Sequence, residues 1–232
     1  MTHDEIKQKL ILAGKVLVSE GQDDFTRGHI SVRLPDDPSR FFMKPHSVGL
    51  DEVTMANILT IDLNGDVVAG TARRHSEVFI HSEIFKARAD VQCVIHTHPT
   101  YAVALSASGR PLKCLSQPGA LFFEALGVYG DTVSLIRTPA AGKGVATALG
   151  PHRAVLLKSH GVAVVGASIE EAVINAIMLE TAAKVQMIAE ASGGAAPEFP
   201  RADIEKLKQE ISQPEQFVIN FNYLARRVQG KA

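Results

Sequence analysis

The sequence of 232 residues has few cysteines, no excess of charge of either sign and no long hydrophobic run. Its two cysteines, Cys93 and Cys114, are isolated and outside any Cys-x-x-Cys spacing, which argues against a disulfide framework and a thiolate metal site. The 24 lysines and arginines nearly balance the 25 aspartates and glutamates, so no overall field attracts nucleic acid or an anionic membrane surface. We therefore expect no nucleic-acid partner.

The unbroken apolar runs, such as 154–157 and 162–165, are far shorter than the ~18–20 residues that span a bilayer. The first residues, 1–5, are acidic, whereas a secretory signal places a basic region ahead of an apolar one. From these patterns we expect no membrane partner and a cytoplasmic location.

The hydrophobic content of 46% and charged content of 21% are typical of a packed globular protein. At this length we expect a single domain over 1–232. Residues 192–197 are rich in Gly, Ala and Pro and predict a break, so 192–232 is expected to form a C-terminal extension. Because that extension is too short to fold alone, it should pack on the core or on a neighbouring subunit.

The first third of the sequence predicts one helix followed by two β-hairpins. Thr2 and Glu5 stand in capping-box register before an apolar helical repeat, which predicts a helix over 4–20. Hairpins are expected over 30–43 and 58–68, the second with Asn64-Gly65 in a type I′ turn.

The remaining patterns mix helices and strands. Helices are expected at 76–88, 102–107, 121–126, 144–149, 169–191 and 201–211, and strands at 91–98, 154–157 and 162–165. Together these elements predict an α/β fold of three layers, α/β/α, in which helices cover a central mixed, mainly antiparallel sheet.

Nine histidines stand out, at positions 3, 29, 46, 75, 81, 96, 98, 152 and 160. His96 and His98 lie two apart on a predicted strand, so both imidazoles face one side, either as metal ligands or as surface residues. His160 ends a buried strand, where a polar group needs a partner or a metal. Three imidazoles with one exchangeable position are typical of a catalytic divalent site.

Glu77, at the start of a predicted helix, has two interpretations. Its carboxylate could complete the metal sphere or carry a proton beside it, or it could stabilise the helix N-terminus through the dipole. His81, one turn later, is a competing ligand that we rank lower and expect to hydrogen-bond in the core.

Four segments carry a resemblance to a known family. In this order and spacing, Gly-His-Ile-Ser-Val-Arg at 28–33, Arg-His-Ser-Glu at 74–77, His-Thr-His-Pro-Thr at 96–100 and Lys-Ser-His-Gly at 158–161 resemble the class II aldolase/adducin family. The resemblance covers about residues 4 to 190 and implies a mixed sheet between helices. It also implies a homotetramer with active sites at subunit interfaces.

The resemblance further implies one divalent metal ion per subunit, held by Glu77, His96, His98 and His160, with Glu77 also serving as the catalytic acid/base. Such a ligand set suits Zn, and also Mn, Fe or Co. The implied chemistry is metal stabilisation of an enolate or enediolate left when a carbon–carbon bond breaks.

The substrate pocket departs from that of the sugar-phosphate members, which carry an Asn, a Thr-Gly and a Ser pair there. This chain has His29 for the Asn, His46-Ser47 in the Thr-Gly region and His75-Ser76 for the Ser pair. A histidine is bulkier and loses its charge near neutral pH, so a phosphate cradle is not expected. We expect these five residues to bind a small non-phosphorylated hydroxy or keto acid, and the enzyme to be a lyase, decarboxylase or aldolase.

Three alternatives stay open or are set aside. A sugar-phosphate aldolase or 4-epimerase shares the chemistry, and a non-catalytic adducin-like interaction module shares the fold. A nucleotide site at 141–144 lacks the P-loop spacing and is set aside. Tyr223 either reaches a neighbour's active site or packs at an interface, and His3 and His152 are expected to have no role beyond structure or surface.

Overall fold

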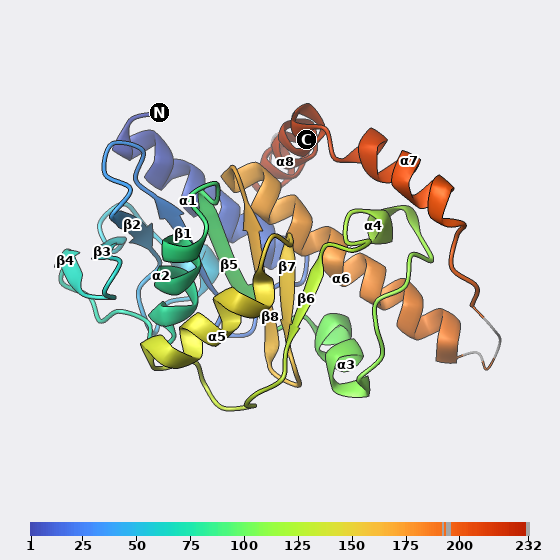
Figure 1. Ribbon diagram of the computed structural model, residues 1–232. Coiled ribbons are helices and arrows are strands. Elements are labelled where there is room, and N and C mark those ends of the chain that lie inside the picture. The colour runs from blue at the N-terminus through green and yellow to red at the C-terminus, as the bar shows by residue number, and fades with distance from the viewer. Residues whose placement is uncertain (192, 194–195, 231–232) are drawn as a thin grey trace.

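The computed structural model describes residues 1–191, 193 and 196–230. Its centre is an eight-stranded sheet in the order β4-β3-β2-β1-β5-β8-β7-β6, and helices lie on both of its faces (Figure 1). All neighbouring strands are antiparallel except β6 and β7, which are parallel. The strands are β1 (His29–Arg33), β2 (Arg40–Met43), β3 (Leu59–Asp62), β4 (Val67–Ala69), β5 (Cys93–Thr97), β6 (Leu126–Tyr129), β7 (Ala154–Leu157) and β8 (Gly161–Gly166). The predicted three-layer α/β fold is confirmed.

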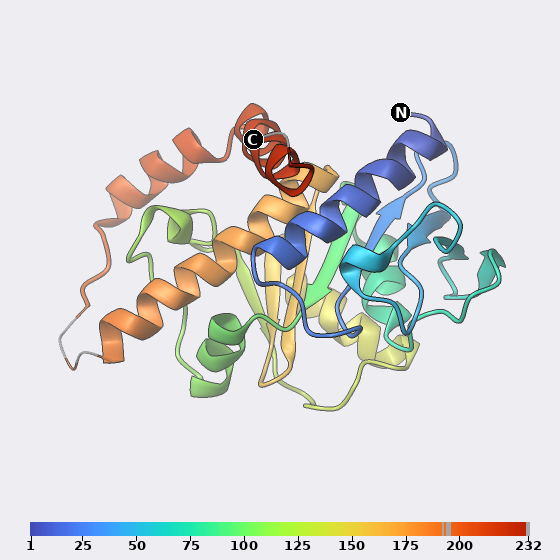
Figure 2. The same cartoon turned by 180° about the vertical axis from the view of Figure 1, so that it is seen from behind.

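Helices α2 and α5 pack together on one face, and α1, α3, α6 and α8 cover the other (Figures 1 and 2). Thr2 and Glu5 form the predicted capping box of α1. The helices are α1 (His3–Ser19), η1 (Leu50–Glu52, a 3-10 helix), α2 (Val78–Ala87), α3 (Thr100–Ser108), α4 (Gln117–Ala120), α5 (Pro139–Leu149), α6 (Ile169–Ala191), α7 (Arg201–Ile211) and α8 (Pro214–Val228).

Alternation along β5 divides its side chains between two hydrophobic cores. Cys93 and Ile95 face the core under α1 and α6, whereas Val94 faces the core under α2 and α5. His96 follows Val94 by two residues and therefore points to the α2 side. On the adjacent strand β1, His29 lies opposite His96. The sheet thus brings two imidazoles side by side beneath α2.

Two local predictions are wrong. The segment expected to be a helix at 121–126 instead forms turns after the short α4 and leads into β6, while its Leu121 and Phe122 are buried in the core under α1 and α6. At the second hairpin only Gly65 has positive φ (88°), so the turn is not type I′. Asp62 Oδ1 accepts hydrogen bonds from the backbone N–H groups of Asn64 and Asp66, both at 2.9 Å, and this side-chain acceptor sets the turn.

The helix expected at 144–149 begins earlier, at Pro139. Thr138 caps it by accepting a hydrogen bond from the N–H of Ala141, and proline suits the first position because it needs no N–H partner there. The early start places the loop 130–138, which precedes α5, beside the end of β5 where the histidines gather.

The C-terminal helix α8 packs on α1 and α6, and its Phe217, Phe221 and Leu224 join the hydrophobic core. Among the described residues, α6 is the one helix long and apolar enough to cross a membrane by length and composition, with a mean hydropathy of 1.3. Half of that window is buried inside the protein, as expected for the core helix of a globular domain.

Candidate metal centre

Four side chains from separate segments meet at one end of the sheet. Glu77 directly precedes α2, His96 is the second-last residue of β5, His98 directly follows that strand, and His160 lies in the turn between β7 and β8. One donor atom from each lies within 4.8 Å of the others. The Nε2 atoms of His96 and His98 are 3.1 Å apart, and His160 Nε2 is 3.6 Å from Glu77 Oε1. The structure therefore brings together all four of the expected metal ligands.

Neighbouring groups orient these ligands. His96 Nδ1 donates to the carbonyl of Val162 at 2.9 Å, which leaves the lone pair of Nε2 facing the centre. Asp24 Oδ2 lies 3.0 Å from His98 Nδ1, and this ion-pair contact places a carboxylate beside that ring to orient it. Glu77 Oε1 accepts a hydrogen bond from the N–H of Ile136 at 2.8 Å. Sequence reasoning did not assign Asp24 or Ile136 to the site, because both lie in loops that carry no periodic hydrophobic pattern.

The backbone around His160 is shaped for close approach. Ser159 adopts a positive φ of 57°, which L residues rarely do and which often marks a functional turn. A Cβ on Gly161 would lie 2.5 Å from the carbonyl oxygen of Thr97 and 2.6 Å from the ring of His98. Glycine at this position therefore allows His98 and His160 to face the same point.

Both ring nitrogens of His160 are buried without a hydrogen-bond partner among the described residues. Leaving a buried polar group unpaired costs free energy, and a bound cation would supply the missing partner. Burial also lowers the pKa of His96 well below its usual value, that of His98 to about 4, and that of His160. The imidazoles are therefore neutral at pH 7, which is the form that binds metal. The donor set fits a divalent cation.

A cavity of about 300 Å³ opens beside this cluster. Of the expected substrate-binding residues, His46, His75 and Ser76 line it. Ser47 Oγ lies 2.5 Å from His46 Nδ1 and holds that ring from outside the cavity. His29 is fully buried behind His75, with ring centroids 4.0 Å apart, and does not line the cavity.

Two arginines that the sequence did not single out, Arg27 and Arg137, also line the cavity. Arg27 donates to Asp24 Oδ1 at 2.6 Å, so it is anchored beside the ring of His98. A neighbouring hollow is lined by Arg73, Arg74 and again Arg137. The nearly neutral chain therefore concentrates positive charge at this mouth, where an anionic substrate would bind.

The other histidines lie elsewhere or play another part. His81 is fully buried and hydrogen-bonded to His29 and Ser31, so it is not a ligand of this centre. His3 pairs with Asp36 on the surface, at 2.7 Å.

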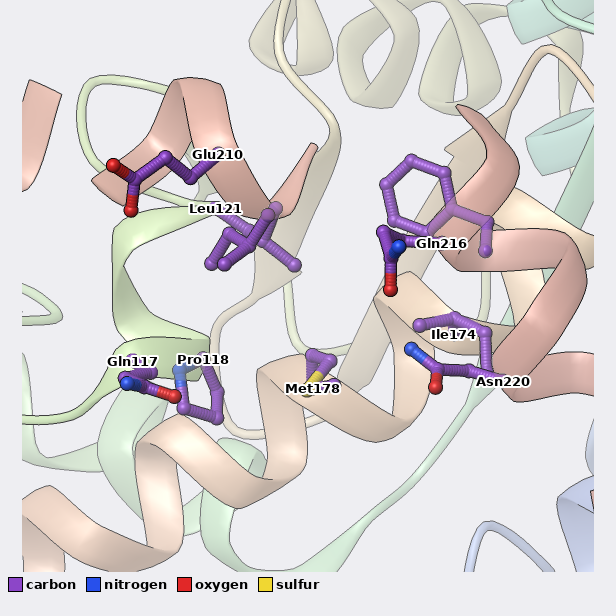
Figure 3. Close-up of a pocket in the computed structure, with 10 residues that line it drawn as sticks. Gln117, Pro118, Leu121, Ile174, Met178, Glu210, Gln216 and Asn220 are labelled. Carbon is purple, nitrogen blue, oxygen red and sulfur yellow. The ribbon is translucent and has the colours of Figure 1, made fainter. Parts of the chain in front are cut away.

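A separate cavity of about 230 Å³ between α4, α6, α7 and α8 is lined mainly by apolar and amide side chains such as Met178, Gln117 and Asn220 (Figure 3).

Asp24→Asn should weaken metal binding by about 10–100-fold, because the carboxylate that orients His98 and raises its basicity is lost. Titration of metal-free protein with Zn²⁺ measures this effect. Asp23→Asn, at the neighbouring residue outside the cavity lining, is the matched control. Equal affinity in the two variants would show that Asp24 does not orient the ligand.

Known proteins resemble the chain in sequence and in structure. Residues 8–187 match the family described as Class II Aldolase and Adducin N-terminal domain. The 3,4-dihydroxyphthalate decarboxylase of Arthrobacter keyseri is 30% identical over 89% of this chain and 88% of its own length. The meiotically up-regulated gene 14 protein of Schizosaccharomyces pombe is 31% identical over 72% of this chain, which spans only 66% of that protein. The solved L-fuculose 1-phosphate aldolase of Glaciozyma antarctica PI12 superposes with a TM-score of 0.88 at 27% identity, covering 97% of this chain and 89% of that one.

Proposed function

Because the chain belongs to the class II aldolase and adducin family, we propose that it is a divalent-metal-dependent carbon–carbon lyase that decarboxylates a non-phosphorylated hydroxy or keto acid. The observation that carries this proposal is the cluster of Glu77, His96, His98 and His160 beside a cavity with arginines and neutral imidazoles. A relative named as a decarboxylase, matched over 88% of its length, supports it.

The four clustered residues would hold the cation, which when bound withdraws electron density from substrate oxygens and so stabilises the negative charge left on carbon. We propose Zn as the metal, with Mn, Fe or Co as alternatives, since imidazole and carboxylate ligands suit all four.

The cavity side chains bind and orient the substrate. The guanidinium groups of Arg27 and Arg137 form charge-assisted hydrogen bonds to a carboxylate. Burial lowers the pKa of His75 to about 3 and also lowers that of His46, so both rings act as neutral hydrogen-bonding groups. Val133 and Leu135 give the cavity an apolar side that suits a ring or an alkyl chain.

Glu77 moves the proton in this proposal. Its Oε1 is engaged by the N–H of Ile136, which leaves Oε2 to exchange a proton with the substrate. Glu77 first takes the proton of a substrate hydroxyl group, and when the bond to the carboxylate breaks and CO₂ leaves, it gives that proton to the remaining carbon.

Aldol cleavage of a sugar phosphate is the second candidate. The hollow lined by Arg73, Arg74, Ser76 and Arg137 offers guanidinium and hydroxyl donors that suit a phosphate group. The structural neighbour from Glaciozyma antarctica is itself named an L-fuculose 1-phosphate aldolase. The non-catalytic module is disfavoured, because the ligand set is complete.

We further propose a cytoplasmic homotetramer with active sites at subunit interfaces. Tyr223 on α8 has half of its surface exposed and is available either to a neighbour's active site or to an interface. Chromatography coupled to light scattering measures the subunit number.

A substrate screen of the metal-loaded enzyme tests the reaction. We expect CO₂ release from hydroxyaromatic or keto acids to exceed aldehyde release from fuculose 1-phosphate and rhamnulose 1-phosphate. Normal enzymatic rates with the sugar phosphates and none with the acids would overturn decarboxylation in favour of the second candidate. If the purified protein holds no metal even after reconstitution with divalent cations, that result would favour the non-catalytic interaction module.

A further inference from the structure

Three buried side chains between β1 and α2 form a chain of short hydrogen bonds. Ser31 Oγ lies 2.5 Å from His81 Nδ1, and His81 Nε2 lies 2.6 Å from His29 Nδ1. Ser31 and His29 belong to β1 and His81 to α2, and all three are fully buried. The chain runs from the core toward the candidate metal centre.

The direction of these hydrogen bonds follows from the hydroxyl group. Among the described residues, His81 Nδ1 is the one hydrogen-bond partner of Ser31 Oγ, so the Ser31 O–H has to donate to it. His81 then carries its proton on Nε2 and donates to His29 Nδ1, which leaves the proton of His29 on Nε2. Burial lowers the pKa of His81 to about 3 and that of His29 well below its usual value, so both rings stay neutral.

The far end of the chain faces the site. One ring nitrogen of His29, one of His75 and a carboxylate oxygen of Glu77 lie within 4.8 Å of one another. Since Nδ1 of His29 is engaged by His81, Nε2 is the nitrogen available to this group, and it has no hydrogen-bond partner among the described residues. A buried N–H without an acceptor is costly, and the nearby carboxylate is an acceptor that a small side-chain movement can reach.

We propose that Ser31 and His81 are positioning residues that hold His29 as its Nε2–H tautomer, so that a neutral donor faces the Glu77 carboxylate from inside the protein. The inference rests on the proposed function, because it assigns these residues to the orientation of Glu77 during proton exchange. His29, expected from the sequence to touch the substrate, acts instead through Glu77.

A second cation held by His29, His75 and Glu77 would need the opposite tautomer, with the lone pair of His29 on Nε2. The Ser31 hydroxyl would then have no acceptor. The positive charge of Lys44 also disfavours a cation here, since Lys44 is fully buried nearby and lowers the pKa of both His29 and His75. The geometry therefore favours the donor.

Nitrogen-15 NMR of metal-free, histidine-labelled protein tests the tautomer without any activity measurement. Signals are assigned with the single variants His29→Asn and His81→Asn. We expect His29 protonated at Nε2 in the parent protein, a mixed tautomer in Ser31→Ala, and recovery in Ser31→Thr, which restores the hydroxyl group. A parent protein with His29 protonated at Nδ1 would overturn the proposal.

Kinetics of the metal-loaded enzyme test the consequence. Ser31→Ala should lower kcat by about 10-fold while KM and metal content stay unchanged, and Ser31→Thr should restore kcat. Ser82→Ala is the matched control, because Ser82 is a buried serine next to His81 whose hydroxyl has no partner among the described residues. Equal losses in Ser31→Ala and Ser82→Ala would overturn the positioning role. If the parent protein shows the expected NMR signals but has no activity, the proposed function is contradicted and the proposed tautomer of His29 is not.

Discussion

Glu77→Gln is expected to keep the metal and to lose turnover by about 10²–10⁴-fold, the usual contribution of a positioned acid or base. The amide has nearly the shape of the carboxylate and retains an oxygen that can contact a cation, but it cannot exchange a proton at neutral pH. The side-chain NH₂ group of the glutamine would also lie near the Nε2–H that we propose for His29, so two hydrogen-bond donors would face each other without an acceptor. Metal content per subunit and kcat are measured on the same preparation.

The matched control for this variant is Glu83→Gln on α2. Glu83 forms an ion pair with Lys86 one turn away and lies outside the metal cluster, so its loss should cost at most about 0.5 kcal/mol of stability and no activity. Full activity of Glu77→Gln would remove the acid/base role, and loss of the metal from Glu77→Gln would make Glu77 primarily a ligand.

His160→Ala is expected to abolish metal retention and activity together, and His98→Ala to do the same. Each substitution removes a ligand outright, so the affinity should fall by more than the ~10–100-fold that the loss of an orienting partner costs. A second readout is stability: added Zn²⁺ should raise the Tm of the parent protein, because it binds the folded state, and should not raise that of His160→Ala.

His152→Ala provides the comparison for this pair. His152 is a partly exposed histidine outside the cluster, so its removal should leave the metal content and the Zn²⁺-induced shift in Tm intact. A normal shift in His160→Ala would exclude His160 from the ligand set, even though its ring faces Glu77.

Much of the fold could be predicted because its signals are local. The capping box before α1, the short apolar strands β5 and β8 and the long helix α6 are each encoded in consecutive residues. Prediction was wrong at 121–126, where a short apolar run is compatible with a helix, but 121–124 form turns and only Leu126 enters the strand β6 that pairs with β7. The predicted type I′ turn at Asn64 was wrong because the Asp62 side chain accepts the backbone hydrogen bond that sets the turn.

Spacing could point to candidate ligands because His96 and His98 share a strand face and His160 follows a buried strand, and the resemblance to the family implied the full set with Glu77. Their partners could not. Asp24 and the N–H of Ile136 come from loops with no periodic pattern, and only the folded chain brings them to His98 and Glu77.

The sequence by itself determined which residue types were available for metal chemistry and the strand and turn on which they stand. Only the tertiary structure decided what each histidine does: His29 was expected in the substrate pocket, yet the pairing of β1 with β5 and the packing of α2 bury it against His81. The physical reason is that spacing fixes the face of a side chain, whereas its tautomer and burial depend on neighbours from distant segments.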